Sequence, residues 1–148
     1  ASLDVSVQAQ IINLLAVLQE RYRTGYVFIS HDLSVVRHIS DRTAVMYLGR
    51  VVEIGPTSAL FDSPAHPYTQ ALIAAAPKLG RGQRERIVLA GEPPSATTRV
   101  TGCRFRERCP RATQICSEVD PVLSPVNSPG QSAACHHPTL SRTPTVAP

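Results

Sequence analysis

The sequence predicts an α/β fold with a mixed sheet, followed by a small irregular region that holds four cysteines. Three observations predict this fold. An amphipathic segment is followed by a short apolar run, as in half of a β-α-β unit. Two β-rich runs flank Gly49, as in a hairpin. All the cysteines come after a stretch rich in Gly, Pro and Arg.

The first predicted element is a helix over residues 5–22. Asp4 or Ser6 can cap its start, and Gly25 breaks the chain after it. Its apolar side chains recur at steps of three and four, which places them on one helical face. They are Val7, Ile11, Leu14, Leu15, Leu18 and Tyr22.

The next predicted element is a short buried strand over residues 26–29, which ends at Ser30-His31-Asp32. Ligands of open α/β sheets lie beyond the carboxyl ends of the strands, so His31 is a candidate site residue. The alternative is that Ser30 or Asp32 caps the following helix and His31 is a solvated loop residue. The pattern by itself leaves both interpretations open.

Four further elements are predicted before Pro77. Apolar spacing favours a helix over residues 33–39, and Gly49 joins β-rich runs at 43–48 and 50–54 into a hairpin. A short helix at 57–61 and an Ala-rich and Leu-rich helix at 68–76 follow, and Pro77 ends the second. We expect residues 1–77 to form one α/β region.

Residues 78–102 are predicted to be a basic linker with a short strand at 87–89. From residue 78 to 111 there are nine cations and three acids. Such a stretch binds nucleic acid in some proteins, but few aromatic side chains accompany it here, so we favour a solvated or subunit-contacting surface. Residues 141–148 are predicted to be a disordered tail, because Pro, Ser and Thr dominate there.

The four cysteines are expected to act together in a region spanning residues 103–140. Gaps of five, six and eighteen residues separate Cys103, Cys109, Cys116 and Cys135. The sequence opens without a secretory signal, which argues against two disulfides. Four thiolates can hold zinc or an iron-sulfur cluster, yet the gaps match neither the usual zinc knuckles nor the common ferredoxin patterns. Spacing leaves both alternatives open.

Size and composition limit the number of domains and the class of protein that this chain can form. At 148 residues and 43% hydrophobic content, the chain can form one ordinary domain or a small domain with an appendage. No apolar run approaches the roughly 20 residues that a membrane helix needs. We expect a non-secreted protein. Because the sequence begins at Ala1 with a loop-like stretch, we also expect it to be part of a longer protein.

Three motifs occur in an order and spacing that resemble the end of an ABC-transporter ATP-binding subunit. They are Ser-Leu-Asp at 2–4, Phe-Ile-Ser-His-Asp-Leu at 28–33 and Met-Tyr-Leu-Gly-Arg-Val-Val-Glu-Ile-Gly at 46–55. Within that superfamily, His-Pro-Tyr-Thr at 66–69 resembles the di- and oligopeptide importer group. The resemblance extends to about Leu140 and implies the C-terminal part of a P-loop NTPase domain.

By this resemblance, His31 matches the switch histidine that hydrogen-bonds the γ-phosphate of ATP. An imidazole can donate to a phosphate oxygen that gains charge during phosphoryl transfer. Asp4 matches the D-loop aspartate at the interface between two ATP-binding subunits. Both are therefore candidate cofactor-binding residues, and His31 is the catalytic candidate.

Several parts of such a site do not occur in these 148 residues. The sequence holds no G-x-x-x-x-G-K-[ST] phosphate loop, since its one lysine is Lys78. The signature motif, the magnesium-binding aspartate and the catalytic glutamate are absent too. Because these groups supply most of the stabilisation of the transferred phosphate, we expect the isolated chain neither to bind ATP with Mg²⁺ tightly nor to hydrolyse it.

The resemblance also favours one use of the cysteines. In some peptide-importer ATPases the matching cysteines ligate a 4Fe-4S cluster, so Cys103, Cys109, Cys116 and Cys135 are expected to hold such a cluster in a structural role. Zinc is the alternative metal. We expect His136 and His137 to lie exposed in a Pro-rich tail and not to act as ligands.

The resulting hypothesis is that this chain is part of an ATPase that powers import of di- or oligopeptides and lies at the cytoplasmic face of the membrane. The implied partners are a second ATPase subunit that is a paralogue, transmembrane permease subunits and, indirectly, an extracytoplasmic peptide-binding protein, with no nucleic acid. Two alternatives remain: a basic four-cysteine zinc module that binds nucleic acid, and a catalytically inert regulatory fragment.

Overall fold

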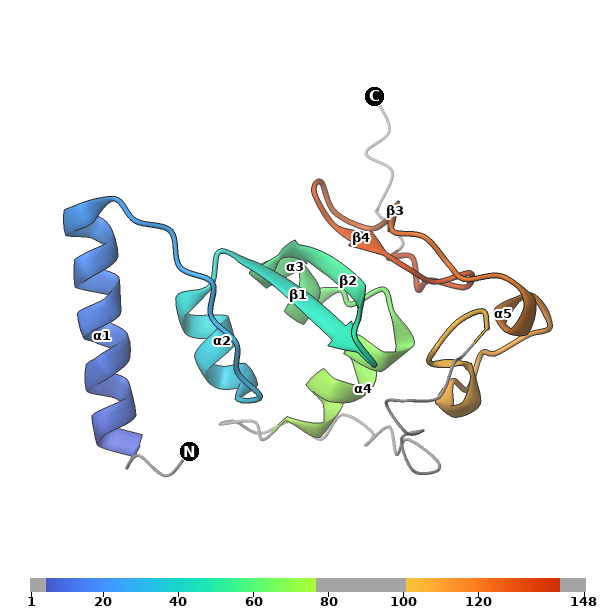
Figure 1. Ribbon diagram of the computed structural model, residues 1–148, viewed down its shortest axis with the longest axis horizontal. Helices are drawn as coiled ribbons and strands as arrows, with labels where there is room; N and C mark the ends of the chain where they lie inside the picture. Colours follow the sequence, from blue (N-terminus) through green and yellow to red (C-terminus); the bar gives the residue numbers. More distant parts are fainter. Residues whose placement is uncertain (1–4, 77–100, 142–148) are drawn as a thin grey trace. The chain divides into compact units, whose positions relative to one another are not determined.

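The computed structural model describes residues 5–76 and 101–141, which fall into two compact units, Ala1–Ser40 and Asp41–Pro148 (Figure 1). Four predictions lie outside the described residues: Asp4 in the D-loop, most of the 78–102 linker with its strand at 87–89, the helix end at Pro77, and the tail beyond residue 141. The division at residues 77 and 78 therefore stays a prediction.

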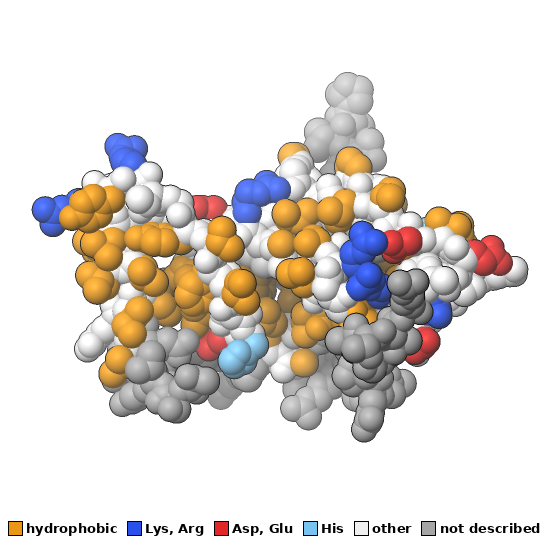
Figure 2. Space-filling model, viewed as in Figure 1, with side chains coloured by type: hydrophobic (Ala, Val, Ile, Leu, Met, Phe, Trp, Pro, Cys, Tyr) orange, Lys and Arg blue, Asp and Glu red, His pale blue; other side chains and the backbone are white. Residues whose placement is uncertain are grey.

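The first unit contains two helices, α1 (Val5–Tyr22) and α2 (Leu33–Ile39), and both match the predicted positions. The predicted apolar face of α1 is largely open to solvent, as the orange side chains over this helix in Figure 2 show. Ile11 and Leu14 are 42% and 57% exposed, and Ile12 is buried. The helix thus forms from its own sequence pattern, and the described part of the chain leaves much of the face that the pattern defines exposed.

The predicted buried strand over residues 26–29 is not formed. These residues have no strand assignment, and Val27 and Ile29 are 96% and 93% exposed. A strand exists only where a neighbouring strand accepts and donates its backbone hydrogen bonds, and the described part of the chain places no partner strand beside it. The apolar residues are present, but residues 5–76 and 101–141 contain no sheet that buries them.

The second unit is built on the predicted hairpin, β1 (Arg42–Tyr47) and β2 (Arg50–Pro56). Leu48 and Gly49 form the turn with φ angles of 45° and 75°, as a two-residue hairpin with the right-handed strand twist requires. Tyr47 pairs with Arg50 across the turn, and a bulge interrupts the register after Val45. The hairpin prediction is confirmed.

The C-terminal segment extends this sheet. Strands β3 (Ser124–Pro125) and β4 (Ser132–Ala133) complete the order β1-β2-β4-β3, with β4 antiparallel to β2 (Figure 1). Every strand pair within the described ranges is antiparallel, so the fold there is mixed α and β with an antiparallel sheet, and the expected parallel pairs are not found. The cysteine-containing segment therefore shares a sheet with the hairpin.

Short helices fill the remainder of this unit. Helices α3 (Thr57–Asp62) and α4 (Pro67–Ala75) follow β2, near the predicted positions. The 3-10 turn η1 (Arg106–Arg108) and helix α5 (Ile115–Glu118) lie in the C-terminal segment. Within the described ranges, no helix combines the length and the apolarity that crossing a bilayer requires.

An aromatic cluster forms the core where the hairpin meets the C-terminal segment. The ring of Phe105 lies 5.2 Å from that of Tyr47 at 85°, and 5.4 Å from that of Tyr68. Edge-to-face packing of this kind adds to the stabilisation from burial. Cys103 and Cys116 are buried in the same cluster, and Val52 completes it.

Candidate functional site

The turn that presents His31 is fixed by two side chains of its own sequence. Oδ1 of Asp32 accepts hydrogen bonds from the backbone N–H groups of Ser34 at 2.9 Å and Val35 at 3.3 Å, so Asp32 is the N-cap of α2. Ser30 Oγ in turn accepts from the Asp32 N–H at 3.0 Å. Of the two predicted capping residues, Asp32 is thus the cap, and Ser30 bonds the backbone of the cap residue.

His31 itself is exposed at the tip of this turn. The buried side chains of Val35 and Val36 anchor the helix that follows, so the ring projects from an ordered backbone. Such a ring is free to donate to a ligand that approaches the turn. Capping by its neighbours does not compete with this role, because it uses neither nitrogen of the imidazole.

The cysteines of the second unit lie in different kinds of local structure. Cys103 and Cys116 are buried, and Cys109 and Cys135 are half-buried. Cys109 ends the 3-10 turn, Cys116 lies in α5, and the sulfur of Cys135 accepts a hydrogen bond from the backbone of His137 at 3.4 Å. All four are free thiols.

Burial makes three of these thiols harder to ionise. It raises the pKa of Cys103, Cys109 and Cys135, the last to about 11. The negative charges of neighbouring cysteines raise these pKa values further, while backbone N–H groups lower them. In the absence of a bound cation, the pKa of each of these three thiols therefore lies above its ordinary value.

The expected four-cysteine metal site is wrong. Among residues 5–76 and 101–141, no three His, Cys, Asp or Glu side chains are arranged to hold a metal ion. A 4Fe-4S cluster requires four converging thiolates, and zinc requires a tetrahedral set of donors. The clustering in the sequence brought the cysteines into one unit, but within the described residues it did not bring three donors together around a metal position. The C-terminal segment is held by its hydrophobic core and its strand pairing instead.

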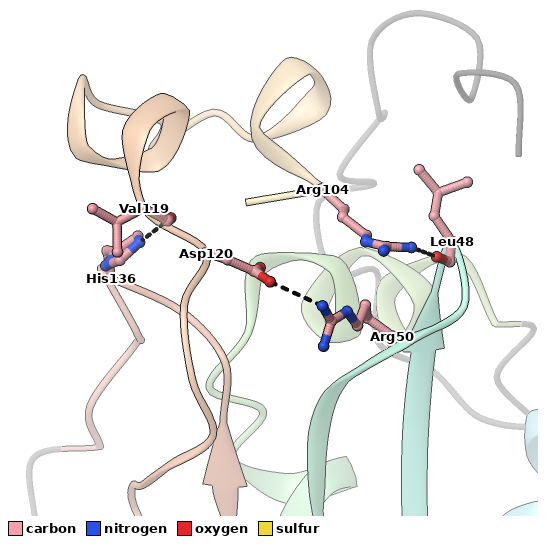
Figure 3. A network of polar contacts seen from close by, with 6 residues as sticks. All are labelled: Leu48, Arg50, Arg104, Val119, Asp120 and His136. Carbon is pink, nitrogen blue, oxygen red and sulfur yellow. Dashed lines mark hydrogen bonds and ion pairs between the residues drawn. The ribbon is translucent and has the colours of Figure 1, made fainter. Parts of the chain in front are cut away.

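The two C-terminal histidines are half-buried and hydrogen-bonded, in contrast to the exposure expected of them. His136 Nε2 donates to the carbonyl oxygen of Val119 at 2.9 Å, and His137 Nε2 lies 2.7 Å from Thr113 Oγ1. Figure 3 shows the first of these contacts beside the ion pair of Arg50 and Asp120. These contacts tie the segment after β4 to the residues around α5.

A buried polar network was not predicted from the sequence. Glu53, on β2, is fully buried, and its Oε1 accepts hydrogen bonds from the N–H of Ala65 at 2.9 Å and the side-chain amide of Gln131 at 2.8 Å. Its Oε2 accepts from the His66 N–H at 2.9 Å. Three donors thus compensate the desolvation of one carboxylate.

His66 serves as the N-cap of α4. Its Nδ1 accepts a hydrogen bond from the Tyr68 N–H at 3.0 Å, and Pro67 occupies the first helical turn. Burial lowers the pKa of His66 to about 4, which keeps the ring neutral and Nδ1 available as an acceptor. The signal in the sequence was His-Pro at a helix start together with a single Glu inside an apolar strand.

Comparison with known proteins shows which proteins this chain is similar to. A family model described as "Oligopeptide/dipeptide transporter, C-terminal region" matches residues 52–116, from β2 to α5. The chain is 52% identical over 139 residues to the oligopeptide transport ATP-binding protein AppF of Bacillus subtilis. It is 50% identical over 138 residues to the dipeptide transport ATP-binding protein DppF of Haemophilus influenzae, and 46% identical to the di/tripeptide transport ATP-binding protein DppF of Pseudomonas aeruginosa.

These alignments cover most of this chain and a smaller share of each relative. They include 92% of the chain and 42% of AppF, and 93% of the chain and 42% of either DppF protein. The chain thus spans about two fifths of the length of the curated relatives that it matches.

Proposed function

Because this chain belongs to the family of peptide ABC transporter ATP-binding proteins, we propose that it is the C-terminal portion of a subunit whose ATP hydrolysis powers import of di- or oligopeptides. The matched region carries the second part of β2, the helices α3 and α4 after it and three of the cysteines. The names of the relatives give no support to the nucleic-acid-binding alternative.

One observation carries the proposal: the exposed ring of His31 on a capped turn. We assign His31 the contact to the γ-phosphate of ATP. The caps hold the backbone of the turn, so the ring needs little ordering when the nucleotide arrives, and it donates to the phosphate oxygen on which negative charge develops.

The exposed apolar segment before this turn supports a larger α/β domain. Val27 and Ile29 are almost fully exposed, although β-branched residues of this kind belong in a sheet interior. The α1 face around Leu14 is open as well. We infer that the remaining P-loop NTPase domain of the subunit covers both surfaces and pairs with residues 26–29 as a strand.

The other parts of the nucleotide site are assigned to that remaining portion of the subunit. Mg²⁺ there would neutralise charge on the phosphates, and we assign it no ligand in this chain. Asp4, which lies outside the described residues, is proposed as the D-loop aspartate that meets the second subunit. The isolated chain is accordingly proposed to lack catalytic competence.

The subunit is proposed to act at the cytoplasmic face of the membrane, in a pair with a paralogous ATPase. Closing of the pair on ATP and its reopening after hydrolysis would drive the permease subunits, which receive peptides from an extracytoplasmic binding protein. The names of the relatives, which are peptide transport ATP-binding proteins, support a role in peptide transport.

The test is a His31→Ala substitution in the complete subunit, assembled with its partners. We expect nucleotide binding to stay nearly unchanged, while ATP turnover falls by the roughly 10²-fold to 10⁴-fold typical of a lost catalytic group. The matched control is His38→Ala, because His38 is also exposed and lies on the helix that follows. Unchanged turnover in His31→Ala, or an equal loss in His38→Ala, would remove the assignment.

A further inference from the structure

One hydrogen bond of the turn before α2 spans His31. Ser30 Oγ accepts from the backbone N–H of Asp32 at 3.0 Å, and His31 lies between these two residues. The ring of atoms that this bond closes contains the backbone nitrogen, the Cα and the carbonyl carbon of His31. Both backbone dihedral angles of His31 lie within that ring, so the bond restricts them. These angles set the direction in which the imidazole leaves the backbone.

The Asp32 end of this bond is fixed to α2. The Asp32 side chain accepts from the N–H groups of Ser34 and Val35, and its carbonyl oxygen accepts from the Val36 N–H at 3.1 Å. Val35 and Val36 are buried, which holds the start of the helix in place. Ser30 therefore bonds to a residue whose position the helix already determines, and a bond to such a residue orients the turn.

The chain before His31 is restrained less. Residues 26–29 have no strand assignment, and Val27 and Ile29 are almost fully exposed. The half-buried Ser30 follows them, and its side chain ties this approach to the cap of α2. The strand pairing proposed for residues 26–29 in the complete subunit ends before Ser30, so the same bond would still connect the end of the strand to the helix.

We propose that Ser30 is a positioning residue that holds the His31 ring toward the γ-phosphate of ATP. This inference rests on the proposed function of His31, and Ser30 is assigned no contact to the nucleotide. A donor stabilises the developing charge only when it already lies within hydrogen-bonding distance, so a ring with more freedom is less often in the productive position. The loss of the bond should therefore lower turnover and leave nucleotide affinity nearly unchanged.

The experiment compares Ser30→Ala with Ser30→Thr in the complete subunit, assembled with its partners. Ala removes the acceptor oxygen, whereas Thr keeps a hydroxyl on Cβ. We expect Ser30→Ala to lower kcat by about 2-fold to 10-fold, the effect of one hydrogen bond, with the KM for ATP nearly unchanged. Ser30→Thr should retain most of the wild-type kcat.

The matched control is Ser34→Ala. Ser34 is an exposed serine of the same turn, and its bond to Asp32 comes from the backbone N–H, which Ala retains. We expect the kcat of this variant to equal that of the wild type. A loss as large as that of Ser30→Ala would mean that any serine change in the turn disturbs catalysis, and it would overturn the specific role of Ser30.

A double-mutant cycle separates positioning from a general effect on folding. Ser30→Ala is repeated in a His31→Ala background, and phosphate release is followed in a single turnover. If Ser30 acts through the His31 ring, its substitution should change the residual rate little in this background. An equal fold-loss in both backgrounds would assign Ser30 to the stability of the fold and overturn the proposal.

The same variants distinguish a failure of this inference from a failure of the proposed function. A large loss in His31→Ala together with wild-type kcat in Ser30→Ala would overturn the positioning role and leave the assignment of His31 intact. Equal losses in Ser30→Thr and Ser30→Ala would also overturn it, because the hydroxyl would then not be the group that matters. Wild-type turnover in His31→Ala would remove the proposed function and this inference together.

Discussion

The side-chain amide of Gln131 donates a hydrogen bond to Glu53 Oε1 at 2.8 Å, although 78 positions separate the two residues in the sequence. Both side chains are almost completely buried. The same amide also donates to the carbonyl oxygen of Ser63 at 3.1 Å. Gln131 thereby joins the C-terminal segment to the hairpin and to the end of α3 at a single point.

Replacing Gln131 with Ala should destabilise the second unit by about 1–3 kcal/mol, because one donor to a buried carboxylate is lost. Urea denaturation followed by circular dichroism measures the change. The matched control is Gln114→Ala, whose amide bonds Glu118 at the exposed surface and whose loss should cost less than about 0.5 kcal/mol. Equal effects of the two substitutions would contradict the role assigned to Gln131.

Gly102→Ala should destabilise the chain by at least about 1–3 kcal/mol, from the strained positive φ alone. The added Cβ would also press on the backbone of Cys116 and Ser117. Gly25→Ala is the control, because a Cβ there meets nothing within 4 Å. Denaturation curves should show a large shift for the first substitution and little or none for the second.

Acid should weaken the fold through His66. The pKa of His66 is about 4 in the folded chain, whereas that of an ordinary histidine is 6.5. Between these two pH values the unfolded chain therefore binds a proton that the folded chain does not. Stability therefore falls as the pH drops through this window, by about 3 kcal/mol in all, and the effect levels off below it. His66→Asn keeps an N-cap acceptor and removes the titration. An unaltered pH slope in this variant would disprove the assignment.

The ion pair between Arg50 and Asp120 should matter little. Its atoms are 3.3 Å apart, but both side chains are more than half exposed, so water and salt screen the attraction. We expect Asp120→Asn to change the free energy of unfolding by less than about 1 kcal/mol, and by less still at high salt. A loss as large as that of Gln131→Ala would mean that the pair is better shielded than its exposure indicates.

Asp32→Ala in the complete subunit should lower ATP turnover more than nucleotide affinity, because removing an N-cap costs about 0.5–2 kcal/mol and loosens the turn that carries His31. Asp32→Asn is the matched control, since an amide oxygen can still accept the Ser34 and Val35 N–H bonds. Steady-state kinetics with nucleotide titration separate the two effects. Equal impairment in both variants would point to the charge of Asp32 and not to its capping bonds.

Local rules were enough for the elements whose interactions lie close together in the chain. The Leu48-Gly49 turn and the Asp32 cap of α2 follow from conformational preferences within a few residues, and both occur as predicted. Residues 26–29 show the limit of such rules. Their apolar pattern predicts a strand, but a strand needs a partner strand, which no local pattern supplies.

The cysteines show that local sequence rules are also insufficient to predict a metal site. Their grouping in the sequence predicts one metal site, yet ligation depends on the arrangement of the side chains in space, and within the described residues no three donors are arranged to hold a metal ion. The sequence by itself determined the hairpin, the helices and the family resemblance, since these rest on neighbouring residues and on motif order. Only the tertiary structure decided that Gln131 meets Glu53 and that Cys103 lies against Cys116, because burial and hydrogen bonding between distant segments are properties of the whole packed unit.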